Sequence, residues 1–464
     1  MRGERAMERE SINAGVKRFV LMALLAVALI LIAVALGRAR TTQQPVEQTI
    51  DEAMQAEVID SISAALNEVY VFPDVAGEME GHIRKKFKEK KYSGIKSLRE
   101  FTDVLTGDLR DISHDKHLGV AAMTPEMLER YSKDELTPEA RRAELDRMKY
   151  NNYDFVKAER LKGNVGYLKF NSFQEAAHAG ATAVAALNFL NHVDALIIDL
   201  RDNGGGNPSM IQLITSYFFE ESVHLNSFYI RKEDSIQQFW TQEYVPGEKM
   251  TDVDLYVLTS NYTFSGAEEF TYNLKNLERA TIIGETTGGG AHPVSERIFP
   301  NLMVGMRLPF GRAINPITGT NWEGTGVTPH IEVPADQALD VAYKEALNKL
   351  KDKADNENQK FNLQWSIDGI NAKLSPVKVD ADLLKKYAGV YGPRTLSFEN
   401  DGLYYQRENR KKMKMIPMAD DLFRFEELDY FRLKIITDEK GQAVEVNGLY
   451  DNGYVDKSPR SDGK

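Results

Sequence analysis

Apolar residues are unevenly spread along the chain, and their spacing predicts a different structure in each region. Phe19 to Gly37 is an uninterrupted apolar run, about as long as a helix that crosses a hydrocarbon core of roughly 30 Å. The basic residues before it outnumber the pair that follows, which favours a cytoplasmic N-terminus. We therefore expect a cytoplasmic tail and a single transmembrane anchor over residues 1–40, with the remaining chain on the outer side of the cytoplasmic membrane.

A cleaved signal peptide is the alternative to a retained anchor. The apolar run is longer than the core of a usual signal peptide, and Gly37-Arg38-Ala39-Arg40 is a poor site for signal peptidase. The chain also has no cysteine to which a lipid could be attached. These features favour the anchor.

The region after the anchor has helical spacing and then loses it. Apolar residues recur at three- and four-residue intervals, which predicts an N-terminal helical domain over residues 41–120. Residues 121–160 are polar and charge-rich, which indicates a connector. The apolar residues of the helical pattern are Ile59, Ile62, Leu66 and Val69, followed by Leu98, Phe101, Leu105 and Leu109.

From Gly163 onward, short apolar runs alternate with helical segments. Such alternation, with continuous apolar strands, is typical of an α/β domain whose largely parallel sheet is covered on both faces. We expect this core over residues 161–353. Its strands are predicted at Val165–Phe170, Ala195–Leu200, Leu255–Leu258 and Thr281–Ile283, and its helices around 181–191, 209–219, 265–277 and 336–353.

The last hundred residues have a different pattern. Residues 354–378 are predicted to be a linker, and residues 379–456 a small antiparallel β domain followed by a tail over 457–464. Turn signals at Asn400-Asp401-Gly402 and Asp438-Glu439-Lys440-Gly441 separate its strands. No chemistry is assigned to this domain.

The composition of the chain argues against several classes of function. A net charge of −11 argues against a nucleic-acid partner, because phosphate binding needs clustered lysine and arginine. The absence of cysteine excludes thiol catalysis, disulfides and Cys-containing metal sites. His114 and His117 are spaced as metal ligands can be, but no further pattern completes a site. No cofactor or metal is expected.

Two segments that directly follow predicted strands contain candidate functional residues. In Asp199 to Asn207, three consecutive glycines follow a strand and could turn N–H groups toward an anion, although a plain tight turn is an equal alternative. In Leu258 to Glu269, Ser265 stands where a loop gives way to a helix. Its hydroxyl and the Gly266 N–H would share the positive end of the helix dipole. The alternative is that Ser265 is only an N-cap residue.

The blocks that contain these junctions resemble the tail-specific (C-terminal processing) serine peptidase family. They are most similar to its branch related to interphotoreceptor retinoid-binding protein and the tricorn core. The resemblance covers about residues 50–350 and implies a crotonase/Clp-like α/β peptidase core. Its blocks are Ala195 to Asn207, Thr263 to Asn276, Thr281 to Pro293 and Asn321 to Pro329.

The resemblance also implies roles for individual residues. Ser265 matches the nucleophile, His117 the base and Glu323 the orienting carboxylate, while the N–H groups of Gly205 and Gly266 match the oxyanion hole. A better-known branch has a lysine base at the position of Gly290, so that dyad is not available here. Lys116 replaces a small polar residue beside His117, and His292 is the rival base.

We therefore expect a serine peptidase that hydrolyses peptide bonds of exported or membrane-associated proteins. Its partners would be polypeptide substrates and, through the N-terminal helix, the membrane. Its base is expected to titrate near neutrality. The alternative is a non-catalytic protein that binds an apolar ligand or a peptide on a peptidase-like fold. The triple of Ser265, His117 and Glu323 favours the enzyme, because a binding protein gains nothing from it.

Overall fold

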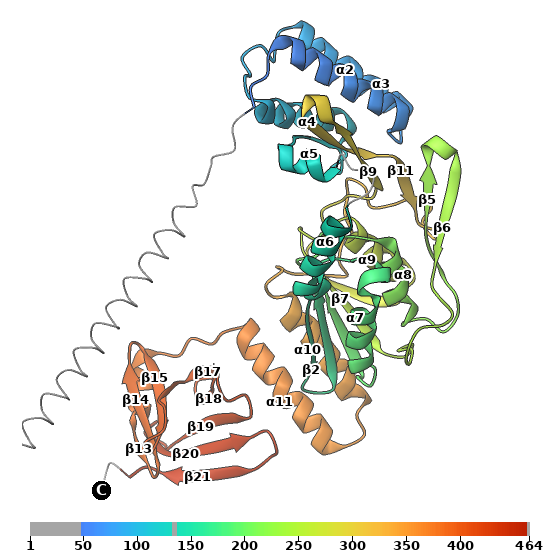
Figure 1. Ribbon diagram of the computed structural model, residues 1–464. Coiled ribbons are helices and arrows are strands. Elements are labelled where there is room, and N and C mark those ends of the chain that lie inside the picture. The colour runs from blue at the N-terminus through green and yellow to red at the C-terminus, as the bar shows by residue number, and fades with distance from the viewer. Residues whose placement is uncertain (1–47, 132–136, 462–464) are drawn as a thin grey trace, which may run out of the picture.

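The computed structural model describes residues 48–131 and 137–461. A helical domain, an α/β core and a C-terminal β domain follow one another along the chain (Figure 1). The expected anchor at Phe19 to Gly37 lies outside the described residues. Within the described ranges, no helix combines the length and the apolar character needed to span a bilayer.

Three helices build the N-terminal domain as the apolar spacing predicts. They are α2 (Glu52–Val69), α3 (Pro73–Lys88) and α4 (Leu98–Ser113). The side chains of Asp51 and Ser97 accept hydrogen bonds from N–H groups in the first turns of α2 and α4, which caps both helices. Ile59, Leu66 and Leu105 are fully or almost fully buried in the core of this domain.

The helical domain does not end at residue 120. Its apolar face packs against a three-stranded antiparallel sheet in the order β1-β10-β9. Only β1 (Gly119–Ala122) is close in sequence, whereas β9 (Val294–Phe299) and β10 (Val304–Pro309) come from the end of the core. Two strands from the core therefore complete the sheet of the helical domain. The predicted boundary missed this because pairing between strands so far apart in the sequence leaves no local pattern.

A six-stranded sheet forms the centre of the core, in the order β12-β8-β7-β4-β3-β2. All neighbouring strands are parallel except β2 and β3. This confirms the largely parallel sheet. The strands are β2 (Phe155–Leu161), β3 (Val165–Phe170), β4 (Ala195–Asp199), β7 (Asp254–Thr259), β8 (Ala280–Gly284) and β12 (Ile331–Glu332).

Helices cover both faces of this sheet, as expected (Figure 1). Leu196 and Ile198 of β4 point into one apolar cluster, and Ala195 and Ile197 into the other, because side chains alternate along a strand. The first cluster is closed by α7 (Ala176–Phe189), α8 (Pro208–Ser216) and α9 (Gly266–Asn276), and the second by α10 (Ala338–Lys353). A small antiparallel sheet of β5 (His224–Ile230), β6 (Ser235–Trp240) and β11 (Gly311–Ile314) flanks the core.

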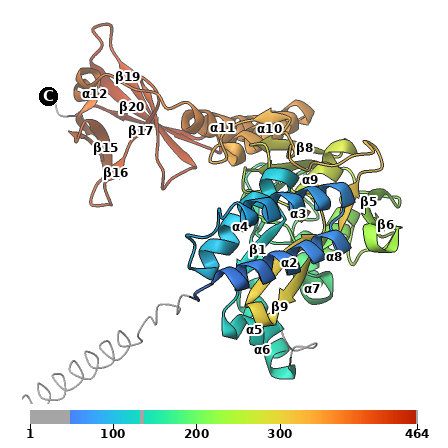
Figure 2. The same cartoon turned by 90° about the horizontal axis from the view of Figure 1, so that it is seen from above.

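The predicted linker over 354–378 is wrong for most of its length. It contains α11 (Glu357–Leu374), which runs beside α10 (Figure 2). Leu363, Ile367 and Ile370 of this helix belong to the second cluster under the sheet. These apolar residues are spaced as one helix face requires, but the polar residues before them hid the pattern.

The predicted connector over 121–160 also contains regular structure. Helices α5 (Pro125–Tyr131) and α6 (Pro138–Tyr150) lie in it, and β2 begins at Phe155. Helix α6 has no buried residue. A helix exposed on all sides shows no apolar period in its sequence, which explains why the spacing did not predict it.

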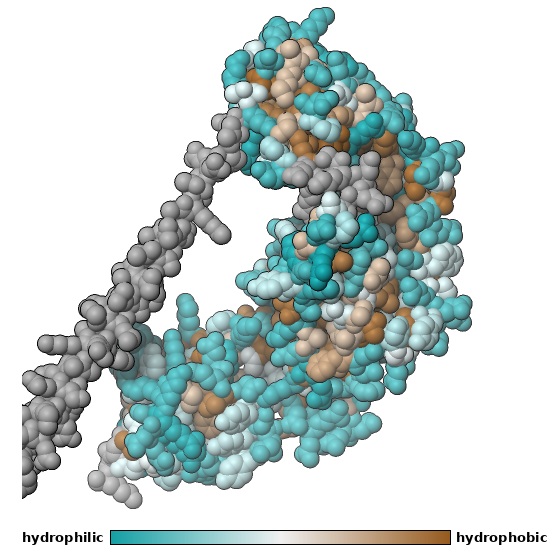
Figure 3. Space-filling model, in the orientation of Figure 1, coloured by the Kyte–Doolittle hydropathy of each residue, from teal (hydrophilic) through white to brown (hydrophobic). Residues whose placement is uncertain are grey.

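The C-terminal domain is antiparallel, as predicted, and consists of two sheets after α12 (Ala381–Tyr387). The two turn signals lie between β14 and β15 and between β19 and β20. Its visible face is mostly hydrophilic (Figure 3). Its strands are β13 (Gly389–Tyr391), β14 (Arg394–Glu399), β15 (Gly402–Arg407), β16 (Met413–Lys414), β17 (Ile416–Ala419), β18 (Leu422–Arg424), β19 (Phe431–Thr437), β20 (Ala443–Tyr450) and β21 (Val455–Pro459).

Candidate active site

Ser265 occupies a sharp turn between β7 and α9. Its backbone angles are φ 53° and ψ −121°, a conformation that side-chain-bearing residues rarely adopt. An ordinary N-cap residue has extended backbone with negative φ, so capping the helix does not require this geometry. Strained backbone of this kind costs on the order of 1–3 kcal/mol and is concentrated at functional sites. The turn therefore favours a functional role for Ser265.

The glycine-rich loop after β4 lies directly against this turn. Gly205 and Gly206 both have positive φ, at 108° and 143°. A Cβ atom on Gly205 would lie 2.7 Å from Gly266 N and 2.8 Å from Ser265 Cβ. Since no Cβ fits there, glycine is required at this position, and the loop is part of the site rather than a distant turn.

Gly205 and Gly206 differ in what their N–H groups do. The Gly205 N–H donates to Asn203 Oδ1 over 2.9 Å, so it does not face an incoming ligand. The nitrogen of Gly206 lies beside Gly266, because a Cβ on Gly266 would be 3.0 Å from it. The expected pair of Gly205 and Gly266 is therefore corrected to Gly206 and Gly266, since a side-chain acceptor already holds the first donor.

Side chains join the two loops to each other. Thr263 Oγ1 donates to the Leu200 carbonyl over 2.8 Å, and Ser260 Oγ to the Arg201 carbonyl over 2.6 Å. Below them, Arg201 pairs with the fully buried Asp199 at 2.6 Å. Burial alone would raise the pKa of Asp199, but its hydrogen bonds and ion pair with Arg201 lower it. The loops are thus held as one rigid unit.

Glu268 is the residue that organises the site, and the sequence did not single it out. Its buried carboxylate accepts hydrogen bonds from Ser265 N at 2.9 Å and from Thr287 Oγ1 at 2.5 Å. It also accepts from Gly289 N at 2.6 Å and Gly290 N at 2.8 Å. Burial raises the pKa of Glu268, and these donors oppose the rise. One carboxylate therefore positions both the turn of Ser265 and the loop after β8. A glutamate three residues after a capping serine is the signal that could have found it.

His117 packs against the loop that carries Ser265. Its ring lies 4.7 Å, centroid to centroid, from the ring of Phe264. A Cβ atom on Gly290 would be 2.2 Å from Phe264 Cζ and 2.7 Å from His117 Cε1. Any side chain at position 290, a lysine included, would collide with both rings. Lys116 contributes to the same junction, because its ammonium group donates to the Gly288 carbonyl over 2.5 Å.

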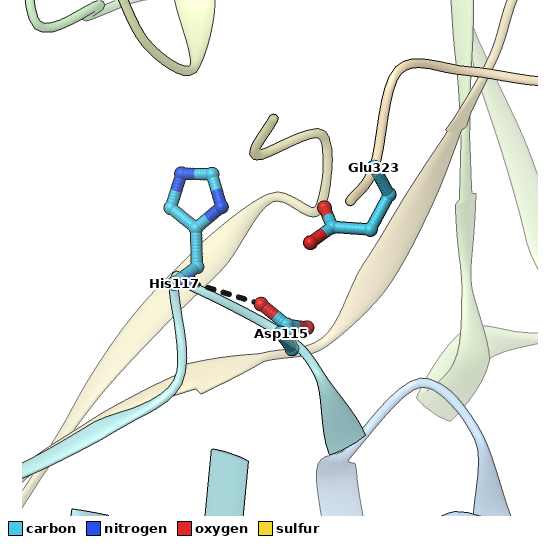
Figure 4. A group of neighbouring side chains, drawn as sticks. All are labelled: Asp115, His117 and Glu323. Atoms are coloured by element: carbon cyan, nitrogen blue, oxygen red, sulfur yellow. Dashed lines mark hydrogen bonds between the residues drawn. The ribbon is translucent and has the colours of Figure 1, made fainter. Parts of the chain in front are cut away.

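His117 and Glu323 face each other with unused polar atoms. His117 Nδ1 and Glu323 Oε1 are both buried and have no hydrogen-bond partner among the described residues. One ligand atom of each residue, and one of Asp115, lie within 4.8 Å of one another. Figure 4 shows one ring nitrogen of His117 on the side of Glu323 and the other pointing away. No hydrogen bond joins these two atoms, although each has the capacity for one.

His292 lies beside the same two carboxylates, with its Nδ1 3.6 Å from Glu323 Oε2. Its Nδ1 lies 2.6 Å from Asp115 Oδ2 and its ring packs edge-on against Phe72 at 5.5 Å. Burial raises the pKa of Asp115, but its contacts with His292 and His117 together outweigh this effect and the pKa is lowered. Asp115 also accepts the His117 N–H over 2.9 Å. Asp115, which the sequence analysis missed, therefore orders both histidines at the junction with the helical domain.

The structure separates the two histidines that were considered as metal ligands. His114 is exposed at the end of α4, whereas His117 is buried. A cation could instead be held by Asp115, His117 and Glu323, whose ligand atoms are close enough together. His117 would then be unable to act as a base, because the metal would occupy its ring nitrogen.

Ser265 opens into a cavity of about 540 Å³. Gly206, Gly266, Gly290 and His292 line it together with Ser265. The cavity thus brings the hydroxyl of Ser265 and two backbone N–H positions to one surface that a ligand can reach. A carbonyl group bound there could be attacked by the hydroxyl and stabilised by the N–H groups.

Replacing Glu268 with glutamine tests its positioning role. The amide NH2 group would face two of the four donors while the remaining oxygen still accepts from the other two, so we expect the free energy of unfolding to fall by about 1–3 kcal/mol. The maximal rate of Ser265 labelling by a fluorophosphonate should fall on the order of 10²-fold, as misplacement of a reacting group typically causes. Denaturant titration and labelling kinetics measure both. Glu278→Gln, at an exposed position just beyond the same helix, is the control, and normal labelling of Glu268→Gln would contradict the role.

Comparison with known proteins identifies the family. Residues 164–333 match peptidase family S41, and residues 51–152 match the N-terminal domain of peptidase S41 in eukaryotic IRBP. The chloroplastic carboxyl-terminal-processing peptidase 2 of Arabidopsis thaliana is 32% identical over 127 residues, which are 27% of this chain and 24% of that protein. The carboxyl-terminal-processing protease of Synechocystis sp. is 32% identical over 128 residues, 27% of this chain and 28% of that protein.

The chain spans well under half the length of the curated relatives it matches. Among solved structures, the tricorn protease is similar over 65% of this chain and 37% of that chain, with 13% sequence identity and a TM-score of 0.43. The two family matches together account for more than half of the residues, and the chain therefore belongs to peptidase family S41.

Proposed function

We propose that this protein is a serine peptidase that hydrolyses peptide bonds with Ser265 as its nucleophile. The observation that carries the proposal is the strained backbone of Ser265 at the wall of a cavity, with Gly206 and Gly266 beside it. A turn of this kind presents a hydroxyl and nearby N–H groups to one bound carbonyl group. The carboxyl-terminal-processing relatives support the same reaction.

Each residue of the site has its own role in the proposed hydrolysis. Ser265 Oγ attacks the peptide carbonyl as His117 accepts its proton, and the N–H groups of Gly206 and Gly266 stabilise the oxyanion. Glu323 orients the His117 ring and stabilises its charged form. The protonated His117 then donates to the departing amine, and water repeats the sequence to release the acyl group from Ser265.

His117 is favoured over His292 by what each ring contacts. The His117 ring contacts Phe264 and faces Gly290, which both adjoin the site of Ser265. The His292 ring contacts Phe72 and Asp115 at the helical domain, and its Nδ1 also lies 3.6 Å from Glu323 Oε2. His292 also lines the cavity, so the two histidines need separate tests.

Single substitutions separate these roles. Ser265→Ala should abolish both fluorophosphonate labelling and peptide hydrolysis, and His117→Ala should lower the rate by several orders of magnitude. Glu323→Gln should cost less, because it removes only an orienting group. Retained activity in His117→Ala with loss in His292→Ala would transfer the base role to His292. A folded wild-type protein that binds peptides but neither labels nor cleaves would support a binding protein instead.

The pH dependence follows from the burial of His117. Burial lowers the pKa of His117 to about 4, and the nearby Asp115 carboxylate only partly offsets this effect. A base must be neutral to accept a proton, and a lowered pKa keeps the ring neutral from neutral pH down to about 4. This value replaces the sequence-based expectation of titration near neutrality.

We therefore expect kcat/KM to stay constant below neutrality and to fall as pH drops through about 4. Circular dichroism at each pH separates this loss from acid unfolding. An acid limb near the ordinary histidine value of 6.5 would contradict the assignment of a buried base.

We further propose that the substrates are exported or membrane-associated proteins and that residues 19–37 hold the enzyme in the cytoplasmic membrane with its catalytic domain outside. The apolar run and the preceding basic residues support this location. N-terminal sequencing of the mature protein should find the apolar run retained, and membrane fractions should contain the activity. A mature chain that begins near Thr41 would overturn the anchor.

A further inference from the structure

Glu269 is a buried acid that the proposed mechanism does not use. Ser265 directly precedes α9, and Glu269 lies one turn into this helix, where its N–H donates to the Ser265 carbonyl over 2.9 Å. Its side chain is only 3% exposed, yet it lines the same cavity as Ser265. An acidic group thus stands inside the space where a substrate next to the nucleophile must lie.

Glu269 differs from the neighbouring Glu268 in its partners. Glu268 has four hydrogen-bond donors, whereas Glu269 makes no ion pair with any described residue. Asn226 of β5 lies near enough to favour the charged form slightly, but burial dominates and raises the pKa of Glu269 to about 7. A buried acid without a cation is costly to ionise. A positive charge supplied by a ligand would remove that cost.

Asn226 adds a second unused group at this place. It is completely buried, and neither its amide nitrogen nor its amide oxygen makes a hydrogen bond of good geometry with a described residue. Buried polar atoms without partners are uncommon in native structures. Asn226 is not among the residues that line the cavity, so its amide group can support the Glu269 carboxyl but does not itself face a ligand.

The walls of the cavity fit a long side chain with a charged end. Phe228, Phe239, Phe310 and Trp322 line it with Glu269. Aromatic surfaces pack against the methylene stems of lysine and arginine and attract their charged heads. The net charge of −11 also favours the approach of basic polypeptides.

We propose that Glu269 determines the specificity of this cavity by pairing with a lysine or arginine side chain next to the cleaved bond. The proposal rests on the proposed peptidase function, because it takes the Ser265 cavity as the place where a polypeptide binds. It assigns the substrate class of that site: polypeptides with a basic residue at one fixed position relative to the cleaved bond.

Peptide binding to the inactive Ser265→Ala protein tests the pocket without requiring catalysis. A set of peptides carries lysine at each position in turn, and a matched set carries norleucine, which has the same stem without the charge. At one position lysine should bind about 10- to 100-fold more tightly, as a charge-assisted contact would give. Isothermal titration calorimetry measures the ratio of the two dissociation constants.

The variants then assign the effect to Glu269. Adding Glu269→Gln to Ser265→Ala should reduce the lysine-to-norleucine ratio to about one, whereas adding the exposed Glu278→Gln should leave the ratio unchanged. If Glu269→Gln does not fold, Glu269→Asp keeps the charge on a shorter stem and should give an intermediate ratio. Equal binding of lysine and norleucine peptides at every position would overturn the proposal.

Cleavage by the wild-type protein separates this inference from the proposed function. Mass spectrometry of the same peptides after incubation shows whether and where bonds are broken. Cleavage without preference for a basic residue would overturn the role of Glu269 and leave the peptidase intact. Tighter binding of lysine peptides without any cleavage would support the pocket and overturn the peptidase.

Discussion

The hydrogen bonds of the Glu268 carboxylate are the interaction on which the active site depends. Glu268 is fully buried and binds the N–H groups of Ser265, Gly289 and Gly290 together with the Thr287 hydroxyl. These groups belong to two separate loops, one before α9 and one after β8. A buried carboxylate is stable when several donors bond to it, whereas burying a carboxylate with too few donors is costly. The same bonds can therefore hold the positive φ of Ser265 in place.

The proposed base and the proposed nucleophile come from different domains. His117 follows α4 of the helical domain, yet its ring contacts Phe264 of the core. Asp115 accepts the His117 N–H and contacts the His292 ring, and β9 and β10 of the core complete the sheet of the helical domain. The packing between the two domains therefore sets the distance between His117 and Ser265.

Two adjacent glutamates on one helix show how environment divides their roles. Glu268 faces the loop after β8 and is saturated with donors, while Glu269 faces the cavity and has no cation. Their difference in partners follows from the 100° turn between successive helical residues. The sequence presents them as one acidic pair, and only their directions separate a structural carboxylate from one open to a ligand.

Local patterns determined the elements and the candidate residues of this protein. Continuous apolar runs such as Leu255–Leu258 predicted the parallel sheet, because burial on both faces leaves no polar alternation. Sequence blocks selected Ser265, His117 and Glu323. Tertiary structure alone decided that Gly206 replaces Gly205 beside Gly266, that Glu268 and Asp115 order the site, and that residues 357–374 form a helix of the core. These three features depend on contacts between residues far apart in the chain. Such contacts follow from packing rather than from local spacing.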